Sequence, residues 1–318
     1  MKLFWSNIKL FRECPKKFLW SKGHKEIDLG FGLGKPVPVP PEDKKSEHHL
    51  LMGSVLSRVV EEIYNRELWK DTSTFMKKAL KLAEVEFHLL EPKYHLEWKQ
   101  MTRQEALDIV LQGTKNFLII MCEHKLVGSF AQSEVAFVER RKTVEGDIGF
   151  CGYADLVIRK DLPDGTSEMM ILDGKNSSTP GVGVDPDQLI WYAICMQAQW
   201  GEKPTKLGFF YFRYPSTNPP ASWDEETQGK WTGFVEVKWD ESDMKRLLDE
   251  ALATKRAIDN KAFEANPIPK VCTDCPYEEL CEERQAQKKA NALKRGHGKS
   301  SKDINIPEAP EGGGFFTL

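Results

Sequence analysis

The sequence predicts an α/β fold in which a central mixed sheet is flanked by helices. Segments with the two-residue period of strands gather between residues 129 and 240. A long stretch with helical periodicity comes before them, and a further helix is expected near 186–200, between two of the strands. This order of elements favours a sheet that is buried between layers of helices.

The first half of the chain is expected to be mostly helical. Glycines and prolines across residues 23–46 predict an extended loop. Apolar residues recur at helical spacing over 50–68, and two more helical stretches follow near 74–90 and 102–126. We therefore expect a helical insert over about residues 70–126.

Strands dominate the part of the chain that follows. Apolar and polar residues alternate in most of these segments, and one short segment is an almost continuous apolar run, as in a strand covered on both faces. The expected strands are the segment with Val135 and Phe137, residues 149–159, Met169–Leu172, residues 206–214 and residues 231–238. A charged amphipathic helix over 241–264 then leads to the last cysteines.

Bulk properties favour a cytoplasmic protein. The chain has 318 residues, a formal net charge of −3 and 40% hydrophobic residues, so a large core is possible and global charge does not announce nucleic-acid binding. No early apolar run resembles a signal peptide, and no stretch approaches the roughly 18 apolar residues of a membrane span. Seven cysteines in such a chain favour reduced thiols and metal binding over disulfides.

Four of the cysteines have the spacing of metal ligands. Cys272 and Cys275 form a C-x2-C pair, Cys281 follows, and a site with four thiolates needs one more. Cys14 could supply it, which would close residues 1–282 into one domain with its catalytic sheet at about 129–240. Chemistry alone leaves zinc and an iron–sulfur cluster as alternatives. The other cysteines have apolar neighbours and are expected to be buried: Cys122, Cys151 and Cys195.

Two acidic residues and a lysine lie on neighbouring expected strands. Asp155 ends the stretch Gly152–Asp155, and Asp173 is followed two residues later by Lys175. Side chains two apart on a strand share a face, so Asp173 and Lys175 point the same way. Two carboxylates could hold Mg²⁺ or Mn²⁺, and the lysine could orient or deprotonate a water and offset phosphate charge. Phosphodiester hydrolysis needs these parts.

Each residue also has a plainer interpretation. Asp155 alone would be an ordinary strand acid, and Asp173 with its glycine would be a turn. Glu134 is expected to be a solvated or supporting strand residue. Glu61 could be a salt-bridged helix acid as easily as a metal ligand. The joint order of the motifs favours the active-site interpretation for Asp155 and Asp173.

This arrangement resembles the PD-(D/E)xK nuclease superfamily, and within it the RecB-like and Cas4-like exonucleases. The resemblance implies a restriction-endonuclease-like core with a metal on Asp155 and Asp173, and with Lys175 as the lysine of the D/E-x-K motif. Gln188 and Tyr192 match the family's Q-x-x-x-Y helix motif, which supports the active site and contacts DNA. The resemblance further implies that a [4Fe-4S] cluster is held by four residues: Cys14, Cys272, Cys275 and Cys281.

One position departs from the family pattern. The family's G-x-x-x-H-x-x-x-E helix carries a metal-binding histidine, but this chain has Ser57 there, between Gly53 and Glu61. A serine is a poor ligand for Mg²⁺, so Glu61 is expected as an additional ligand, directly or through water. The departure leaves two alternatives open: an active nuclease, or a catalytically decayed DNA-binding or scaffold protein that keeps the fold.

The resemblance implies a metal-dependent deoxyribonuclease, an exonuclease of recombination, repair or replication in a bacterium, an archaeon or one of their viruses. Its expected partner is DNA, as single strands or duplex ends. Residues 283–318 are expected to form a basic and then disordered tail, which either follows a DNA backbone or is merely solvated. Its tip, Phe315 and Phe316, could bind a replication or recombination protein, although the glutamine of a full clamp-binding motif is missing.

Overall fold

The computed structural model describes residues 2–23, 47–98, 101–143, 146–177, 184–213 and 233–297. The chain divides into two compact units: unit 1 is Met1–Arg12 with Glu42–Ala262, and unit 2 is Glu13–Pro41 with Phe263–Leu318. Most of the loop expected over residues 23–46 and the tip with Phe315 and Phe316 lie outside the described residues.

Unit 1 is built around a mixed sheet in the order β1-β3-β4-β5-β6, with β2 paired to β3. The strands are β1 (Lys2–Leu3), β2 (Phe130–Thr143), β3 (Gly146–Asp161), β4 (Ser167–Lys175), β5 (Lys206–Tyr211) and β6 (Phe234–Val237). The pairs β1–β3 and β4–β5 are parallel, and the others are antiparallel. Because β2 follows β3 along nearly its whole length, β1 and β4 share the other edge of β3.

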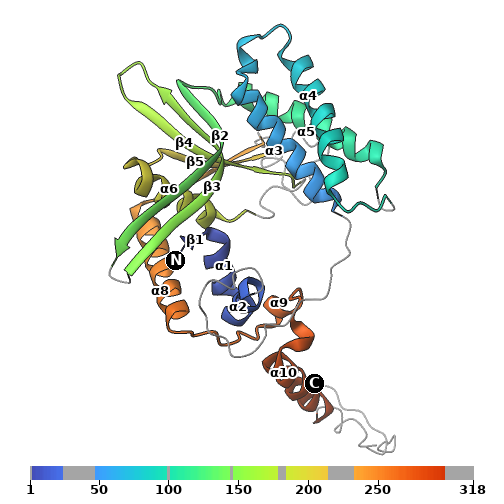
Figure 1. Ribbon diagram of the computed structural model, residues 1–318, viewed down its shortest axis with the longest axis vertical. Coiled ribbons are helices and arrows are strands. Elements are labelled where there is room, and N and C mark those ends of the chain that lie inside the picture. Colours follow the sequence, from blue (N-terminus) through green and yellow to red (C-terminus); the bar gives the residue numbers. More distant parts are fainter. Residues whose placement is uncertain are drawn as a thin grey trace, which may run out of the picture. The chain divides into compact units, whose positions relative to one another are not determined.

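Apolar side chains alternate between the two faces of this sheet, and helices cover both (Figure 1). Ile171 and Phe209 pack toward α6 (Pro186–Trp200) and α8 (Glu241–Asp259). Leu172 and Phe210 pack on the opposite face toward α3 (His48–Asn65) and α5 (Arg103–Glu123). Two separate cores follow from the two-residue period. The predicted α/β fold with a mixed sheet between helices is confirmed.

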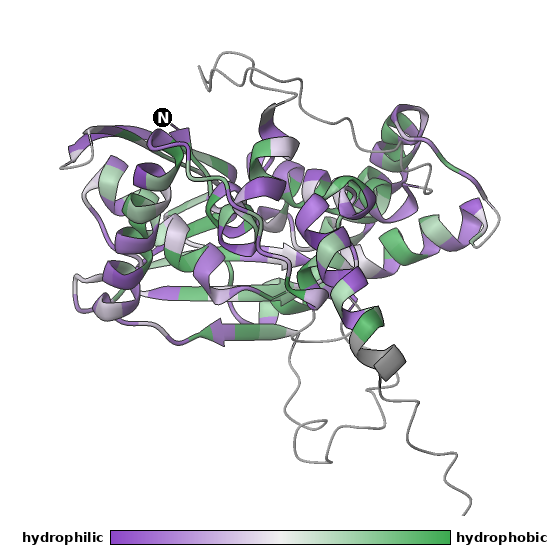
Figure 2. Ribbon diagram, turned by 90° about the horizontal axis from the view of Figure 1, so that it is seen from below, coloured by the Kyte–Doolittle hydropathy of each residue, from purple (hydrophilic) through white to green (hydrophobic). Residues whose placement is uncertain are grey.

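The expected helical insert forms a layer of its own. Helix α4 (Phe75–Leu90) packs against α3 and α5, and short 3-10 turns flank it, η2 (Leu68–Lys70) and η3 (Glu91–Lys93). Thr102 and Glu105 start α5 with a capping box, which pairs amides that have no partner within the helix. Figure 2 shows hydrophobic and hydrophilic residues mixed around the helices, as expected for amphipathic segments.

Cysteine burial follows the sequence expectation in part. Cys151 and Cys195 are buried, but Cys122 is exposed near the end of α5, so the expectation for Cys122 was wrong. Apolar neighbours in sequence do not bury a residue that the helical rotation turns to the solvent side. No helix among the described residues has both the length and the apolar character to cross a membrane.

Unit 2 consists of short helices around the remaining cysteines. They are α2 (Pro15–Gly23), α9 (Pro269–Cys272), η4 (Glu278–Leu280) and α10 (Glu282–His297). Helix α1 (Trp5–Glu13) comes directly before Cys14, and its Trp5 and Ile8 belong to the core of unit 1. Residues 282–297, for which the sequence indicated only a basic tail, form α10.

Candidate active site and cysteine centre

Three acidic residues occupy one row across neighbouring strands where the strand pairing is interrupted. The β2–β3 register is continuous except at Glu134, which would oppose Asp155. The β3–β4 pairing ends at Leu156 with Leu172, one position before Asp155 and Asp173. Glu134 and Asp155 are therefore unpaired in these two ladders, whereas Asp173 still pairs with Phe209 of β5, and the side chains can converge at this row.

The amide of Gln188 lies at the centre of the site. Its Nε2 donates to Asp173 Oδ1 at 2.9 Å and to the Tyr192 hydroxyl oxygen at 2.9 Å. Its Oε1 accepts from Lys175 Nζ at 3.2 Å. A primary amide both donates and accepts, so it can join a carboxylate to an ammonium group without adding charge. Gln188 and Tyr192 are one turn apart on α6, which places both on the same helix face.

Asp173 and Lys175 share one face of β4, as the alternation predicted. Lys175 Nζ lies 2.6 Å from Asp173 Oδ2 and 5.0 Å from the centroid of the Phe209 ring. Gly174 lies between them, and its amide N–H donates to Asp155 Oδ2 at 2.8 Å. The aspartates and the lysine that the motif predicts are thus joined through short polar contacts.

The site holds more negative charge than its lysine can balance. Burial raises the pKa of Asp155 well above its ordinary value, and the neighbouring charges of Asp173 and Glu134 raise it further. Burial also raises the pKa of Asp173, against the attraction of Lys175. Crowded carboxylates with raised pKa values are stabilised as anions by a cation, so this donor set of hard oxygens fits Mg²⁺ or Mn²⁺.

Glu134, for which the sequence favoured a solvated or supporting strand residue, lies beside the carboxylates of this row. Its φ of 50° is in the left-handed region, which non-glycine residues rarely adopt. Burial raises the pKa of Glu134, and the charges of Glu61 and Asp173 add to the rise. Its position opposite Asp155 depends on the β2–β3 register. The signal in the sequence was a single glutamate within an alternating strand, and alternation does not reveal which residue it opposes.

Helix α3 contributes an open groove beside Glu134. Ser57 and Glu61 line the groove together with Gly53, Arg58 and Glu134. Arg58 donates to the Glu61 carboxylate and also pairs with the Glu62 carboxylate of α3 at 3.0 Å. Glu61 therefore lies on the α3 side of Glu134 with a cationic partner, whereas the predicted aspartates lie in the group around Gln188.

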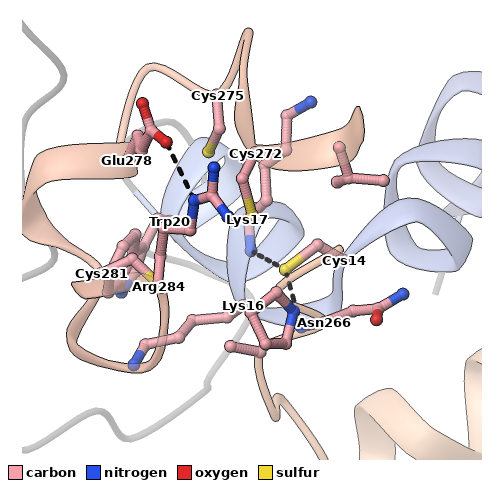
Figure 3. A pocket seen from close by; sticks show the side chains of 13 residues that line it. Cys14, Lys16, Lys17, Trp20, Asn266, Cys272, Cys275, Glu278, Cys281 and Arg284 are labelled. Atoms are coloured by element: carbon pink, nitrogen blue, oxygen red, sulfur yellow. Dashed lines mark hydrogen bonds and ion pairs between the residues drawn. The ribbon is translucent and has the colours of Figure 1, made fainter. Parts of the chain in front are cut away.

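The four predicted cysteine ligands line one hollow within unit 2 (Figure 3). Figure 3 shows the Arg284 side chain reaching in among the sulfur atoms. Two backbone N–H groups, those of Lys17 and Asn266, donate to Cys14 Sγ at 3.5 and 3.4 Å. The cysteines are Cys14, Cys272, Cys275 and Cys281, and all are free thiols.

Burial favours the protonated thiol over the thiolate at two of these cysteines. Burial raises the pKa of Cys272, while Arg284 acts in the opposite direction. Burial likewise raises the pKa of Cys281. Across the parts of the chain that the structure describes, no three His, Cys, Asp or Glu side chains are grouped to hold a single metal ion.

The mixed sheet between layers of helices is consistent with the fold of PD-(D/E)XK nucleases. The sequence matches the PD-(D/E)XK nuclease superfamily over residues 5–282, and the chain belongs to this family of metal-dependent nucleases. The chain is also similar to the solved crystal structure of SSO0001, at 14% sequence identity and a TM-score of 0.32, covering 76% of this chain and 98% of that one. A search of curated proteins found no match.

Proposed function

We propose that this protein is a DNA exonuclease of the RecB-like, Cas4-like type, which hydrolyses single-stranded ends in recombination, repair or replication. The observation that supports it most is the hydrogen-bonded group in which Gln188 links Asp173, Lys175 and Tyr192. Packing of the sheet and helices alone does not require such a hydrogen-bonded group of polar side chains. Asp155 lies beside this group and accepts a hydrogen bond from the backbone N–H of Gly174, the residue between Asp173 and Lys175.

Asp155 and Asp173 would hold Mg²⁺ or Mn²⁺, with Glu134 adjacent as a third oxygen donor and Glu61 beyond it. When bound, the cation supplies a Lewis acid for the phosphate and acidifies water. With Glu134 in this row, the site gains an oxygen donor that does not depend on the missing histidine at Ser57. Hard oxygen donors suit such cations better than a serine hydroxyl does.

Lys175 would orient the attacking water and offset charge that develops on the phosphate. Gln188 fixes the position of the Lys175 ammonium by accepting from its Nζ. Tyr192 is not a base here, because burial raises its pKa and keeps the hydroxyl protonated. Its role is to hold the Gln188 amide by accepting from Nε2.

The test uses end-labelled single-stranded DNA with Mn²⁺ or Mg²⁺, and EDTA as the metal-free control. The wild type should release short products from linear but not circular strands, whereas Asp173→Ala and Lys175→Ala should lose at least a hundredfold in rate. The matched control is Glu168→Gln, which changes an acid of the same strand that pairs with Lys206 on the surface. DNA binding without any metal-dependent product would instead favour the decayed scaffold protein.

We also propose that Cys14, Cys272, Cys275 and Cys281 hold a [4Fe-4S] cluster. One feature supports it: the four thiols line the same hollow within unit 2. Donation of backbone N–H groups to Cys14 Sγ favours a thiolate that ligates iron. The cluster would have a structural role within unit 2 and take no part in cleavage.

Purification without oxygen tests the cluster. The wild type should be brown and contain about four iron and four sulfide per chain, and Cys275→Ser should lose both. Cys122→Ser is the matched control because Cys122 is exposed on α5, outside unit 2. A colourless protein with one zinc per chain would replace the cluster with the zinc alternative.

A further inference from the structure

The first turn of α6 is held from outside by two arginines that meet at one carboxylate. Arg246 of α8 donates from Nη2 to Asp187 Oδ1 at 2.6 Å and from Nη1 to Oδ2 at 3.4 Å. Arg12 of α1 donates from Nη1 to Asp187 Oδ2 at 3.1 Å. Both carboxylate oxygens of Asp187 are thus engaged, which is the geometry of strong charge-assisted hydrogen bonds.

The N-cap side chain of α6 does not cap the start of the helix. Asp185 is the N-cap residue, yet its side chain makes no capping hydrogen bond and pairs instead with Lys9 at 3.2 Å. The first helical residue is Pro186, so the turn begins without a donor from that residue. A helix start whose N-cap side chain makes no capping bond tends to fray, so external contacts at Asp187 help to fix the turn.

The residue next to Asp187 is Gln188, on which the polar network of the site depends. We propose that Arg12, Asp187 and Arg246 form a positioning clamp that sets the rotation and depth of the Gln188 side chain. This inference rests on the proposed nuclease function and assigns to that site a group of residues outside the reacting centre. Asp187 itself touches neither Asp173 nor Lys175 through any hydrogen bond or ion pair found among the described residues.

The geometry gives the direction and size of the effect. Neighbouring residues on a helix are about 100° apart, so a change in the rotation of the first turn moves Gln188 sideways across the site. Its bonds to Asp173 and Lys175 are 2.9 and 3.2 Å, and a shift of about 1 Å would break both. Misplacement of this size costs on the order of a hundredfold in rate.

Arg12, one of the two clamp arginines, has further contacts that fix its position. Arg12 lies 5.1 Å over the Trp5 ring, and Trp5 is buried in the core of unit 1. Arg12 also approaches Glu250 of α8 at 3.6 Å. Arg12 of α1 and Arg246 of α8 therefore both bind Asp187, and through it they hold the first turn of α6.

The test combines rate and coupling on metal-loaded full-length protein. Asp187→Ala should lower kcat on single-stranded DNA by about ten- to a hundredfold with little change in KM. Combined with Gln188→Ala it should add almost nothing, because both changes remove one function. Arg246→Lys should keep more activity than Arg246→Ala. Glu241→Gln, which changes an acid of α8 that pairs with Lys203 and not with either clamp arginine, is the matched control and should keep the wild-type rate.

A second readout separates the clamp from the nuclease assignment. In metal-free protein, the side-chain amide resonances of Gln188 should shift in Asp187→Ala and stay in place in Glu241→Gln. If the wild type cuts no DNA but these resonances shift, the nuclease proposal fails and the clamp stands. If Asp187→Ala is folded and keeps its kcat, or loses activity additively with Gln188→Ala, the clamp is refuted.

Discussion

Gly152 leaves the space that the ring of Tyr192 occupies, and replacing it by alanine should separate activity from folding. A Cβ at residue 152 would lie 2.8 Å from Tyr192 Cδ1 and 3.1 Å from Cε1. Ordinary contact begins at 3.4 Å, so the ring would have to withdraw by about 0.6 Å, the difference between 3.4 and 2.8 Å. Tyr192 is buried in a close-packed core, so its ring has little room to move.

The displacement reaches the site through one hydrogen bond. The bond from Gln188 Nε2 to the Tyr192 hydroxyl is 2.9 Å, and a withdrawal of 0.6 Å would stretch it to about 3.5 Å, where little attraction remains. We expect Gly152→Ala to lose about 1–3 kcal/mol of stability from overpacking. We expect kcat to fall by about two- to tenfold, because Gln188 loses one hydrogen bond that supports it.

The assay compares kcat on single-stranded DNA, measured below the unfolding transition, with thermal unfolding followed by circular dichroism. Gly113→Ala is the matched control, because its Cβ would lie 3.0 Å from Leu56 Cδ2 on α3, away from the Gln188 network. That variant should keep its kcat, whatever its change in stability. The reasoning is refuted if folded Gly152→Ala has the kcat of the wild type, or if both variants lose activity only in proportion to the unfolded fraction.

Three further outcomes are expected. Burial and neighbouring charge raise the pKa of Asp155, so its contribution to stability is present at low pH and is lost as the pH rises through the raised pKa. The melting temperature of metal-free Asp155→Asn should therefore exceed that of the wild type at pH 8, and the difference should disappear toward pH 4. Tyr192→Phe should lower kcat about two- to tenfold with an unchanged pH profile, because the hydroxyl only accepts from Gln188. Asn116→Ala should cost about 1–3 kcal/mol in urea unfolding, because it leaves the Phe212 carbonyl, now bonded at 2.7 Å, without its donor.

The sequence predicted the parts of the site that depend on local spacing. Asp173 and Lys175 lie on one strand face because strand alternation needs no tertiary information. Gln188 and Tyr192 lie on one helix face for the corresponding reason. The prediction that these residues carry catalysis stays a proposal, and so do the four cysteine ligands.

Glu134 could not be assigned from the sequence because its place depends on non-local pairing. A shift of one residue in the β2–β3 register would turn Glu134 to the other face of the sheet. Helix α10 was missed for a different reason: its surface is so rich in charge that it resembles a solvated tail. Charges there are paired across the turn before it, as in Lys288 with Glu278 and Glu279 at 3.3 and 3.0 Å.

The crowding of carboxylates explains why the fold keeps a site that costs it stability. Asp155, Asp173 and Glu134 repel one another in one row, with Lys175 as the nearest cation in the described network. Without metal this repulsion weakens the folded state, and a cation that binds only the folded state stabilises it by mass action. In the proposed metal site, the same charges that destabilise the metal-free protein would therefore provide its affinity for a divalent ion. A neutral Gln188 at the centre fits this logic, because a second cation in its place would compete with the metal for Asp173.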